Sequence, residues 1–249
     1  MNFEIHSGDC INTMANMYDE SIDHCITDPP YEIGFMGNGW DNSGIAYNPD
    51  TWRAVHRILK KDGLLLAFGA TRTHHRIAHA IERAGFEILD VWSWTFGTGF
   101  PKSQNIGKVL NKKGHEEEAE KWKGFGTALK PAWEPIIVAR KQGSKVMPNK
   151  HKFWYVPKAS KAERNEALPA DMLNDHPTVK PITLMTHLIL ETSKEGDTIF
   201  DPFMGSGSTG VAALRSKRNF VGCELTPDYI PIATTRLEKE IEKYAIHTE

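Results

Sequence analysis

The segment DPFMGSGSTG, residues 201–210, constrains the fold of this chain more than any other stretch. The preceding residues, DTIFD at 197–201, predict a strand that ends at Asp201, and the residues after the glycines predict a helix. Gly205, Gly207 and Gly210 have the spacing G-x-G-x-x-G. A glycine-rich turn between a strand and a helix lets backbone N–H groups approach a ligand closely. The segment therefore predicts an α/β fold with a nucleotide-type ligand at a strand end.

The position of Glu224 supports a ligand that carries a ribose. Glu224 ends the next predicted strand, nineteen residues after Gly205, where a carboxylate can bind ribose hydroxyls. NAD would meet these requirements, but the Asp201 carboxylate before the turn would repel a pyrophosphate and suits a cationic ligand. Only 39 residues follow Gly210, which is short for a dinucleotide domain unless the sheet is permuted. A tight turn without any ligand is the structural alternative.

Strands and helices alternate along most of the chain, as in a doubly wound, mostly parallel sheet. Besides the strand at 197–201, we expect strands at residues 3–9, 23–27, 63–69, 87–96, 133–141 and 219–224. Helices are expected after the first strand and at residues 48–60, 72–86, 181–193, 208–217 and from Pro227 onward. The pattern predicts one domain, 1–249, with residues 101–175 as an inserted region.

A second motif, DPPY at residues 28–31, follows another predicted strand. It combines a carboxylate, two prolines and an aromatic ring, and a strand could not accommodate the prolines. In a parallel sheet the carboxyl ends of the strands share one edge, where ligands bind. Asp28–Tyr31 and Gly205–Ser208 should therefore face the same crevice.

The composition excludes several classes of protein. The 249 residues are 40% hydrophobic and 25% charged, which suits one globular unit with a large core. No apolar run approaches the ~20 residues of a membrane span, and the start, MNFEIH, does not resemble a secretory signal. The three cysteines are far apart and predict neither disulfides nor zinc, so a cytosolic protein is expected. We also expect no metal at His75 and His79, because no acidic residue has ligand spacing to them.

Charge is distributed unevenly along the chain. The net charge is −2, yet residues 101–164 contain fifteen Lys and Arg against six Asp and Glu. Aromatic residues such as Trp122 and Phe125 lie within this basic block. A basic block within an acidic chain indicates a surface for a polyanion such as nucleic acid, and a solvated lysine-rich insertion is the alternative.

Taken together, the motifs resemble those of the amino-methylating (N6-adenine and N4-cytosine) DNA methyltransferases in their circularly permuted, β-class arrangement. In that family the DPPY motif precedes the target-recognition region, and the S-adenosylmethionine motif comes last. The resemblance covers most of the chain, through GDC (8–10), DPPYEIGFMGNGWD (28–41), FGTGFPKSQN (96–105), HPTVKP (176–181), DPFMGSGST (201–209) and GCELTPDY (222–229). It implies a Rossmann-like methyltransferase fold, 101–175 as the target-recognition region, and S-adenosylmethionine rather than NAD.

The resemblance also implies roles for the first motif. The exocyclic amine of adenine is a poor nucleophile, because its lone pair is delocalised into the ring. Asp28 and the carbonyl oxygen of Pro29 would each accept a hydrogen bond from that amine, and Pro29 and Pro30 would hold the backbone rigid. Tyr31 would stack on a base extruded from the duplex. Positioning and electrostatics would then supply the acceleration without a covalent intermediate.

The cofactor residues implied by the resemblance surround the glycine-rich turn. Asp201 would hold the methionine ammonium, directly or through water, and Glu224 would bind the ribose, while Asp9 and Cys10 would border the adenine. The full implied set is Asp9, Cys10, Asp28, Thr178, Lys180, Asp201, Phe203, Gly205, Ser206, Gly207, Ser208, Thr209 and Glu224. Glu134 also falls within the resemblance, but the sequence indicates no physical role for it.

The partner implied by the resemblance is double-stranded DNA in the cytoplasm of a bacterium or of a phage host. We expect phosphate contacts among five lysines of the basic block: Lys102, Lys108, Lys112, Lys113 and Lys121. Many relatives form homodimers, and no unambiguous apolar patch decides whether this chain does. A stand-alone methylase is favoured, because no nuclease-like motif is evident in the sequence.

Three functions are compatible with these motifs. The first is an adenine-N6 DNA methyltransferase, and the second is a cytosine-N4 enzyme of the same fold. Relatives of the second kind more often have serine in place of Asp28. The third is a DNA-binding module that has lost catalysis, against which the intact motifs at 28–31 and 205–209 argue.

Overall fold

A computed structural model describes residues 1–34, 39–97, 104–127, 131–142 and 152–246. Within these residues, eight strands form one sheet in the order β1-β8-β7-β2-β3-β5-β4-β6. Their bounds are β1 (Phe3–Ser7), β2 (Ile22–Thr27), β3 (Leu59–Phe68), β4 (Glu87–Thr95), β5 (Trp133–Arg140), β6 (Phe153–Tyr155), β7 (Thr198–Asp201) and β8 (Asn219–Glu224). Only β5 pairs antiparallel, with β3 and β4, among these strands. The predicted doubly wound, mostly parallel sheet is confirmed.

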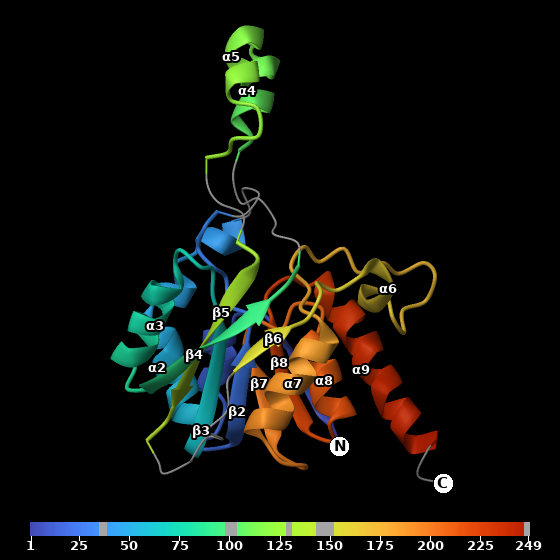
Figure 1. Ribbon diagram of the computed structural model, residues 1–249. Coiled ribbons are helices and arrows are strands. Elements are labelled where there is room, and N and C mark those ends of the chain that lie inside the picture. Colours follow the sequence, from blue (N-terminus) through green and yellow to red (C-terminus); the bar gives the residue numbers. More distant parts are fainter. Residues whose placement is uncertain (35–38, 98–103, 128–130, 143–151, 247–249) are drawn as a thin grey trace.

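Helices cover both faces of the sheet (Figure 1). One face carries α1 (Cys10–Ala15), α2 (Pro49–Ile58) and α3 (His74–Arg83), and the other carries α7 (Ile182–Thr192), α8 (Ser208–Arg215) and α9 (Tyr229–Ile246). The remaining helices are α4 (Ile106–Lys112), α5 (Glu116–Lys121) and α6 (Lys161–Arg164), with 3-10 turns η2 (Gly39–Asn42) and η3 (Ile45–Tyr47). This three-layer arrangement gives the protein two hydrophobic cores, one on each face of the sheet.

Strand β3 shows how the sequence creates the two cores. Its apolar run is buried on both faces: Leu64, Leu66 and Phe68 join one core, and Leu65 and Ala67 join the other. Successive side chains of a strand point to opposite faces, so a continuous apolar run is needed where helices cover both.

Two features of the middle of the chain differ from the sequence pattern. Strand β6 is only three residues long, too short for a periodicity, and was not expected. Both β5 and β6 belong to the central sheet although they lie within residues 101–175, which we expected to be inserted. Helices α4 and α5 instead stand away from the sheet, at the top of Figure 1. The part of the basic region that projects from the body is thus a short helical hairpin.

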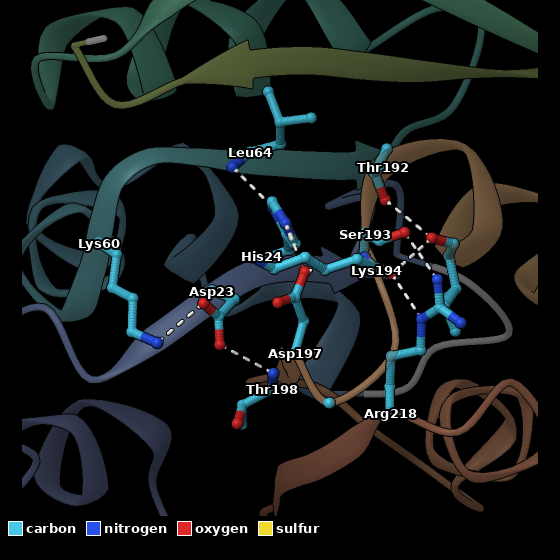
Figure 2. A network of polar contacts seen from close by, with 12 residues as sticks. Asp23, His24, Lys60, Leu64, Thr192, Ser193, Lys194, Asp197, Thr198 and Arg218 are labelled. Carbon is cyan, nitrogen blue, oxygen red and sulfur yellow. Dashed lines mark hydrogen bonds and ion pairs between the residues drawn. The ribbon is translucent and has the colours of Figure 1, made fainter. Parts of the chain in front are cut away.

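A buried polar network joins β2 to the segment before β7 near the amino ends of these strands (Figure 2). His24 of β2 is 4% exposed, and its Nδ1 accepts a hydrogen bond from the backbone N–H of Leu64 at 3.1 Å. The Nε2 of His24 lies 3.5 Å from Oδ2 of Asp197.

No helix in the described part of the chain is long and apolar enough to cross a membrane.

Candidate active site

The corner Asp28–Tyr31 follows β2 directly, at the edge where the parallel strands end. Its prolines fix two backbone φ angles and have no N–H to donate. Two hydroxyls hold the far end of the corner, because the carbonyl oxygen of Tyr31 accepts hydrogen bonds from Tyr47 Oη (3.0 Å) and Thr73 Oγ1 (3.2 Å). The corner therefore holds the Asp28 carboxylate in a fixed position.

The ammonium of Lys180 lies between two carboxylates. Its Nζ donates a hydrogen bond to Oδ2 of Asp28 and lies 3.7 Å from Oε2 of Glu134. The same Glu134 oxygen accepts a hydrogen bond from Tyr31 Oη at 2.9 Å. The Lys180 side chain is only 8% exposed, and three aromatic ring centroids lie 5.0 to 5.8 Å from its Nζ: Phe68, Tyr31 and Trp94.

Glu134 reaches this cluster because β5 runs against its neighbours. The first residues of an antiparallel strand lie where the adjacent strands end, and Glu134 pairs with Trp94 near the end of β4. A strand parallel to β3 and β4 would have placed its first residues at the opposite edge. This topology is the signal that was missing when the sequence indicated no role for Glu134.

One oxygen of the Asp28 carboxylate has no partner. Oδ2 is bonded to Lys180, but Oδ1 is buried and has no hydrogen bond within the described residues. Buried carboxylate oxygens are almost always hydrogen-bonded, because an unsatisfied one costs free energy. Such an acceptor in a rigid corner is suited to a donor group from a ligand.

Burial governs the ionisation of this cluster. Burial raises the pKa of the Asp28 carboxyl, and the positive charge of Lys180 opposes that rise. Burial alone would lower the pKa of Lys180, but the charges of Asp28 and Glu134 outweigh it and raise that pKa. Burial and the same two carboxylates hold the pKa of Tyr31 well above its usual value. We therefore assign Lys180 as an ammonium and Tyr31 as a neutral hydrogen-bond donor.

The glycine-rich turn lies beside this corner, between β7 and α8. Gly205 and Gly207 have φ angles of +53° and +80°, which other residues rarely adopt. A Cβ atom on Gly205 would lie 2.9 Å from Nε2 of His176. The N–H of Gly205 donates to Oε2 of Glu224 at 2.9 Å, and Nη1 of Arg236 donates to the carbonyl oxygen of Ser206 at 2.6 Å. The turn is thus held from β8 and from α9.

Asp201 has its carboxylate fully engaged within the protein. It accepts hydrogen bonds from Thr27 Oγ1 and Thr209 Oγ1, both at 2.6 Å, and from the N–H of Phe203 at 3.1 Å. Burial raises its pKa to about 6, against these hydrogen bonds, which lower it. Asp201 therefore ties β2 to the glycine-rich turn, and its effect on a ligand would be mainly through its charge.

A cavity of about 230 Å³ opens between the two motifs. Of the thirteen residues expected to bind a cofactor, twelve line it: Asp9, Cys10, Asp28, Thr178, Lys180, Asp201, Phe203, Gly205, Ser206, Ser208, Thr209 and Glu224. Gly207 does not, because it faces α9, where an added Cβ would lie 3.2 Å from the Cβ of Ala233. His176 and Tyr229 also line the cavity and were not predicted, although both lie in segments that carried the resemblance.

A second cavity, of about 220 Å³, lies on the other side of Asp28. Of the predicted catalytic residues, Asp28, Pro29 and Tyr31 line this second cavity, whereas Pro30 lines the first. Four residues are shared by the walls of both cavities: Asp28, Thr178, Val179 and Lys180. Unpredicted residues complete the second wall: Ile33, Asp41, Trp94, Glu134, Lys158, Arg164 and Pro177. A group bound in either cavity would thus approach Asp28.

The predicted phosphate-binding lysines lie on the α4–α5 hairpin. Lys108, Lys112 and Lys113 are exposed on or just after α4, and Lys121 is exposed at the end of α5. Lys102 lies outside the described residues. Helix α5 begins with three glutamates, so the hairpin has a basic helix and an acidic one.

Comparison with known proteins identifies the family. A sequence model of the N6/N4 family of DNA methylases matches residues 22–235, so the chain belongs to that family. It is therefore a DNA amino-methyltransferase, of the N6-adenine or N4-cytosine kind.

Individual relatives match over nearly the whole chain. The type II methyltransferase M2.DpnII of Streptococcus pneumoniae is 28% identical, over 96% of this chain and 90% of that protein. M2.MboI of Moraxella bovis is 27% identical, over 94% and 87% respectively.

Solved structures share the fold at lower identity. The M1.HpyAVI–SAM complex has a TM-score of 0.64 at 23% identity, covering 94% of this chain and 98% of that one. The cytosine-N4-specific PvuII DNA methyltransferase has a TM-score of 0.70 at 18% identity, covering 98% and 92%.

Proposed function

We propose that this chain transfers a methyl group from S-adenosylmethionine to the N6 amino group of a target adenine in double-stranded DNA. The observation that carries the proposal is the position of Asp28 Oδ1. It is a buried acceptor without a partner in the described structure, in the wall that separates two cavities. An amine donor in the second cavity would satisfy it while facing a methyl donor in the first.

The first cavity suits S-adenosylmethionine by charge and shape. Four carboxylates line it, those of Asp9, Asp28, Asp201 and Glu224, which favours a ligand with an ammonium and a sulfonium. Backbone N–H groups of Gly205 and Thr226 fix the two oxygens of Glu224 in the cavity wall, and each oxygen has a second lone pair that can accept a ribose hydroxyl. The Cys10 thiol in the same wall is no nucleophile, because burial raises its pKa to about 12.

When bound, S-adenosylmethionine supplies an electrophilic methyl group, so that a nitrogen–carbon bond replaces the sulfur–carbon bond and sulfur keeps the electron pair. The protein's part is to make the amine nucleophilic. Asp28 Oδ1 accepts one amine hydrogen and the carbonyl oxygen of Pro29 accepts the other, which favours a pyramidal nitrogen. Asp28 Oδ1 then takes the proton that the nitrogen loses. Burial raises the pKa of Asp28, which makes it a better proton acceptor than an exposed aspartate.

The second cavity would hold the extruded base. Tyr31 lines this cavity and is held by Glu134, which supports a stacking role for its ring. The α4–α5 hairpin carries exposed lysines and the exposed aromatic pair Trp122 and Phe125, and we assign it to the target-recognition region. Both curated relatives come from bacteria, which supports action on bacterial DNA in the cytoplasm.

Nucleoside analysis tests the proposal. The enzyme is incubated with methyl-labelled S-adenosylmethionine and amplified DNA of mixed sequence, which carries no earlier methylation. We expect the label in N6-methyladenine, because an aspartate rather than a serine opens the DPPY motif. Label only in N4-methylcytosine would replace adenine by cytosine as the target. No transfer to any DNA, with S-adenosylmethionine binding retained, would instead leave a DNA-binding module without catalysis.

A further inference from the structure

We propose that Glu134 is a positioning residue, which holds Lys180 and Tyr31 so that one oxygen of Asp28 remains free for the amine. The inference rests on the proposed methyl transfer to an amino group, and it applies equally to adenine and cytosine. It gives a role to a residue of β5 that lies outside both sequence motifs.

The first argument is the geometry around one oxygen atom. Oε2 of Glu134 accepts the Tyr31 hydroxyl at 2.9 Å and lies 3.7 Å from Nζ of Lys180. The ammonium is therefore drawn toward two carboxylates and bonds to only one oxygen of Asp28. Without the charge of Glu134, the flexible lysine would be free to move across the Asp28 carboxylate and cover Oδ1. Glu134 thus maintains the open acceptor on which the proposed chemistry depends.

The second argument is the net charge of the cluster. Asp28 and Glu134 carry two negative charges against the single positive charge of Lys180, and all three side chains are at most 18% exposed. Glu134 lines the second cavity and is absent from the wall of the first. As the new bond forms, positive charge develops on the amine in the second cavity. The charge of Glu134 consequently favours the transition state over the ground state, which is the requirement for raising kcat.

Other charged groups face the cluster and define its surroundings. Asp41, Lys158 and Arg164 line the second cavity, while His176 and Asp201 line the first. These groups are common to the variants compared below, so differences among the variants report on Glu134 itself.

The central variant is Glu134→Gln, which keeps the size of the side chain and an acceptor for Tyr31 but removes the charge. We expect kcat about tenfold lower, with the Kd for S-adenosylmethionine from calorimetry within about twofold of wild type. The charge of Glu134 contributes to raising the pKa of Asp28. The acid limb of the kcat profile should therefore move to lower pH in the variant. A merely structural role would lower the plateau without moving the limb.

Two further variants separate charge from hydrogen bonding. Tyr31→Phe removes the hydroxyl but leaves the charge of Glu134. Because the Tyr31 hydroxyl lowers the pKa of Asp28, this variant should lower the rate while the acid limb moves to higher pH, opposite to Glu134→Gln. Glu87→Gln is the matched control. Glu87 accepts a hydrogen bond at 2.7 Å from Arg140, at the other end of β5, and its side chain is 54% exposed. Glu87→Gln should leave kcat unchanged.

The outcomes distinguish this inference from the proposed function. If wild-type protein methylates DNA and Glu134→Gln has the same kcat and pH profile, the role of Glu134 is wrong and the proposed function stands. If Glu134→Gln lowers kcat and shifts the acid limb, the inference is supported. If wild-type protein transfers no methyl group to either base, the proposed function fails, and the inference fails with it.

Discussion

The sheet carries a polar network at each of two opposite edges, and the two networks differ in how their carboxylates are satisfied. At the amino edge, both oxygens of Asp23 have partners, Lys60 Nζ at 2.8 Å and the N–H of Thr198 at 2.9 Å (Figure 2). At the carboxyl edge, Asp28 uses one oxygen on Lys180 and leaves the other without a hydrogen bond in the described structure. Both aspartates belong to or follow β2, five residues apart.

This difference distinguishes a network that stabilises the fold from one that has an acceptor available to a ligand. A buried polar group with all its partners inside the protein fixes the strands and loops that provide them. A buried acceptor with no partner lowers stability, and it is retained where a ligand supplies the missing donor. Mutations at the amino edge should therefore change the free energy of unfolding, and mutations at the carboxyl edge should change the rate.

The largest effect is expected for Asp28→Ala. It removes one of two acceptors for the amine, while the carbonyl oxygen of Pro29 remains, so kcat should fall on the order of a hundredfold to a thousandfold. The carboxylate that is lost also pairs with the buried Lys180 through Oδ2, so the melting temperature should fall, and the rate is compared per folded molecule. Methyl transfer at the wild-type rate would contradict the role assigned to the carboxyl edge. Asp28→Asn keeps the shape and removes the charge, so it should again reduce turnover more than cofactor binding.

Arg218→Ala should show the opposite behaviour at the amino edge. Arg218 is 5% exposed, and it donates to Ser193 Oγ at 2.9 Å and to the Ser193 carbonyl oxygen at 2.6 Å. Loss of these bonds from a charged donor should reduce the free energy of unfolding by about 3 kcal/mol. Urea unfolding measures this change, and the methylation rate per folded molecule should be unchanged. The exposed neighbour Lys217→Ala is the control. A reduced rate with unchanged stability would break the division between the two edges.

The sequence could predict the parts of the site that depend on local rules. Strand ends, glycine spacing and proline geometry placed Asp28, Gly205 and Glu224 at one edge, and the first cavity contains all three. These signals are contained within segments of about twenty residues or fewer. The fold class followed from the same kind of information, because alternating strands and helices restrict the topology.

The parts that escaped prediction depend on distant pairings. Lys180 lines the first cavity as expected, but its ion pair with Asp28, 152 residues away, was not predicted. Glu134 reaches the site only because β5 is antiparallel, and no local pattern distinguishes an antiparallel strand from a parallel one in an apolar run. Asp201 was expected to hold the methionine ammonium directly or through water, and its bonds to Thr27 and Thr209 show that it also holds the turn in place. Register and direction are tertiary properties, which spacing rules do not encode.

His176 should make the carboxyl edge sensitive to acid. Burial, together with the nearby Lys180, lowers its pKa from 6.5 to about 4. The unfolded chain therefore binds a proton before the folded protein does, and stability is lost as the pH falls from 6.5 toward 4. Asp201 has the opposite effect, because burial raises its pKa from 3.8 to about 6. It contributes stability that is fully present below pH 3.8 and is lost as the pH rises through 6. The two effects partly cancel in the wild-type protein.

The variant His176→Asn removes the contribution of His176 to the pH dependence of stability and leaves that of Asp201. When the pH is lowered from 7.5 to 5, the variant should gain about 2 kcal/mol of stability relative to wild type, because it lacks the histidine that is protonated on unfolding. Because the measurement is a difference between two pH values, any constant loss of stability from the substitution cancels. Parallel pH curves for the two proteins would show that His176 does not titrate in this way.

The smallest effects are expected where charge is fully exposed, on the α4–α5 hairpin. Lys108, Lys112, Lys113 and Lys121 are all exposed, so each should contribute to DNA affinity through counterion release rather than through a fixed geometry. Changing a lysine that contacts phosphate to glutamine should flatten the plot of log affinity against log salt by ~0.9. Lys239→Gln on α9 removes the same charge from another exposed surface and should leave the slope unchanged. The loss should be similar for any DNA sequence, because phosphates carry no sequence information.

If all four lysines can be replaced together without changing the slope, DNA does not bind at this hairpin. A flattened slope with an unaltered kcat at saturating DNA would instead show that exposed charge here adds affinity alone, in contrast to the buried charges of Asp28 and Glu134.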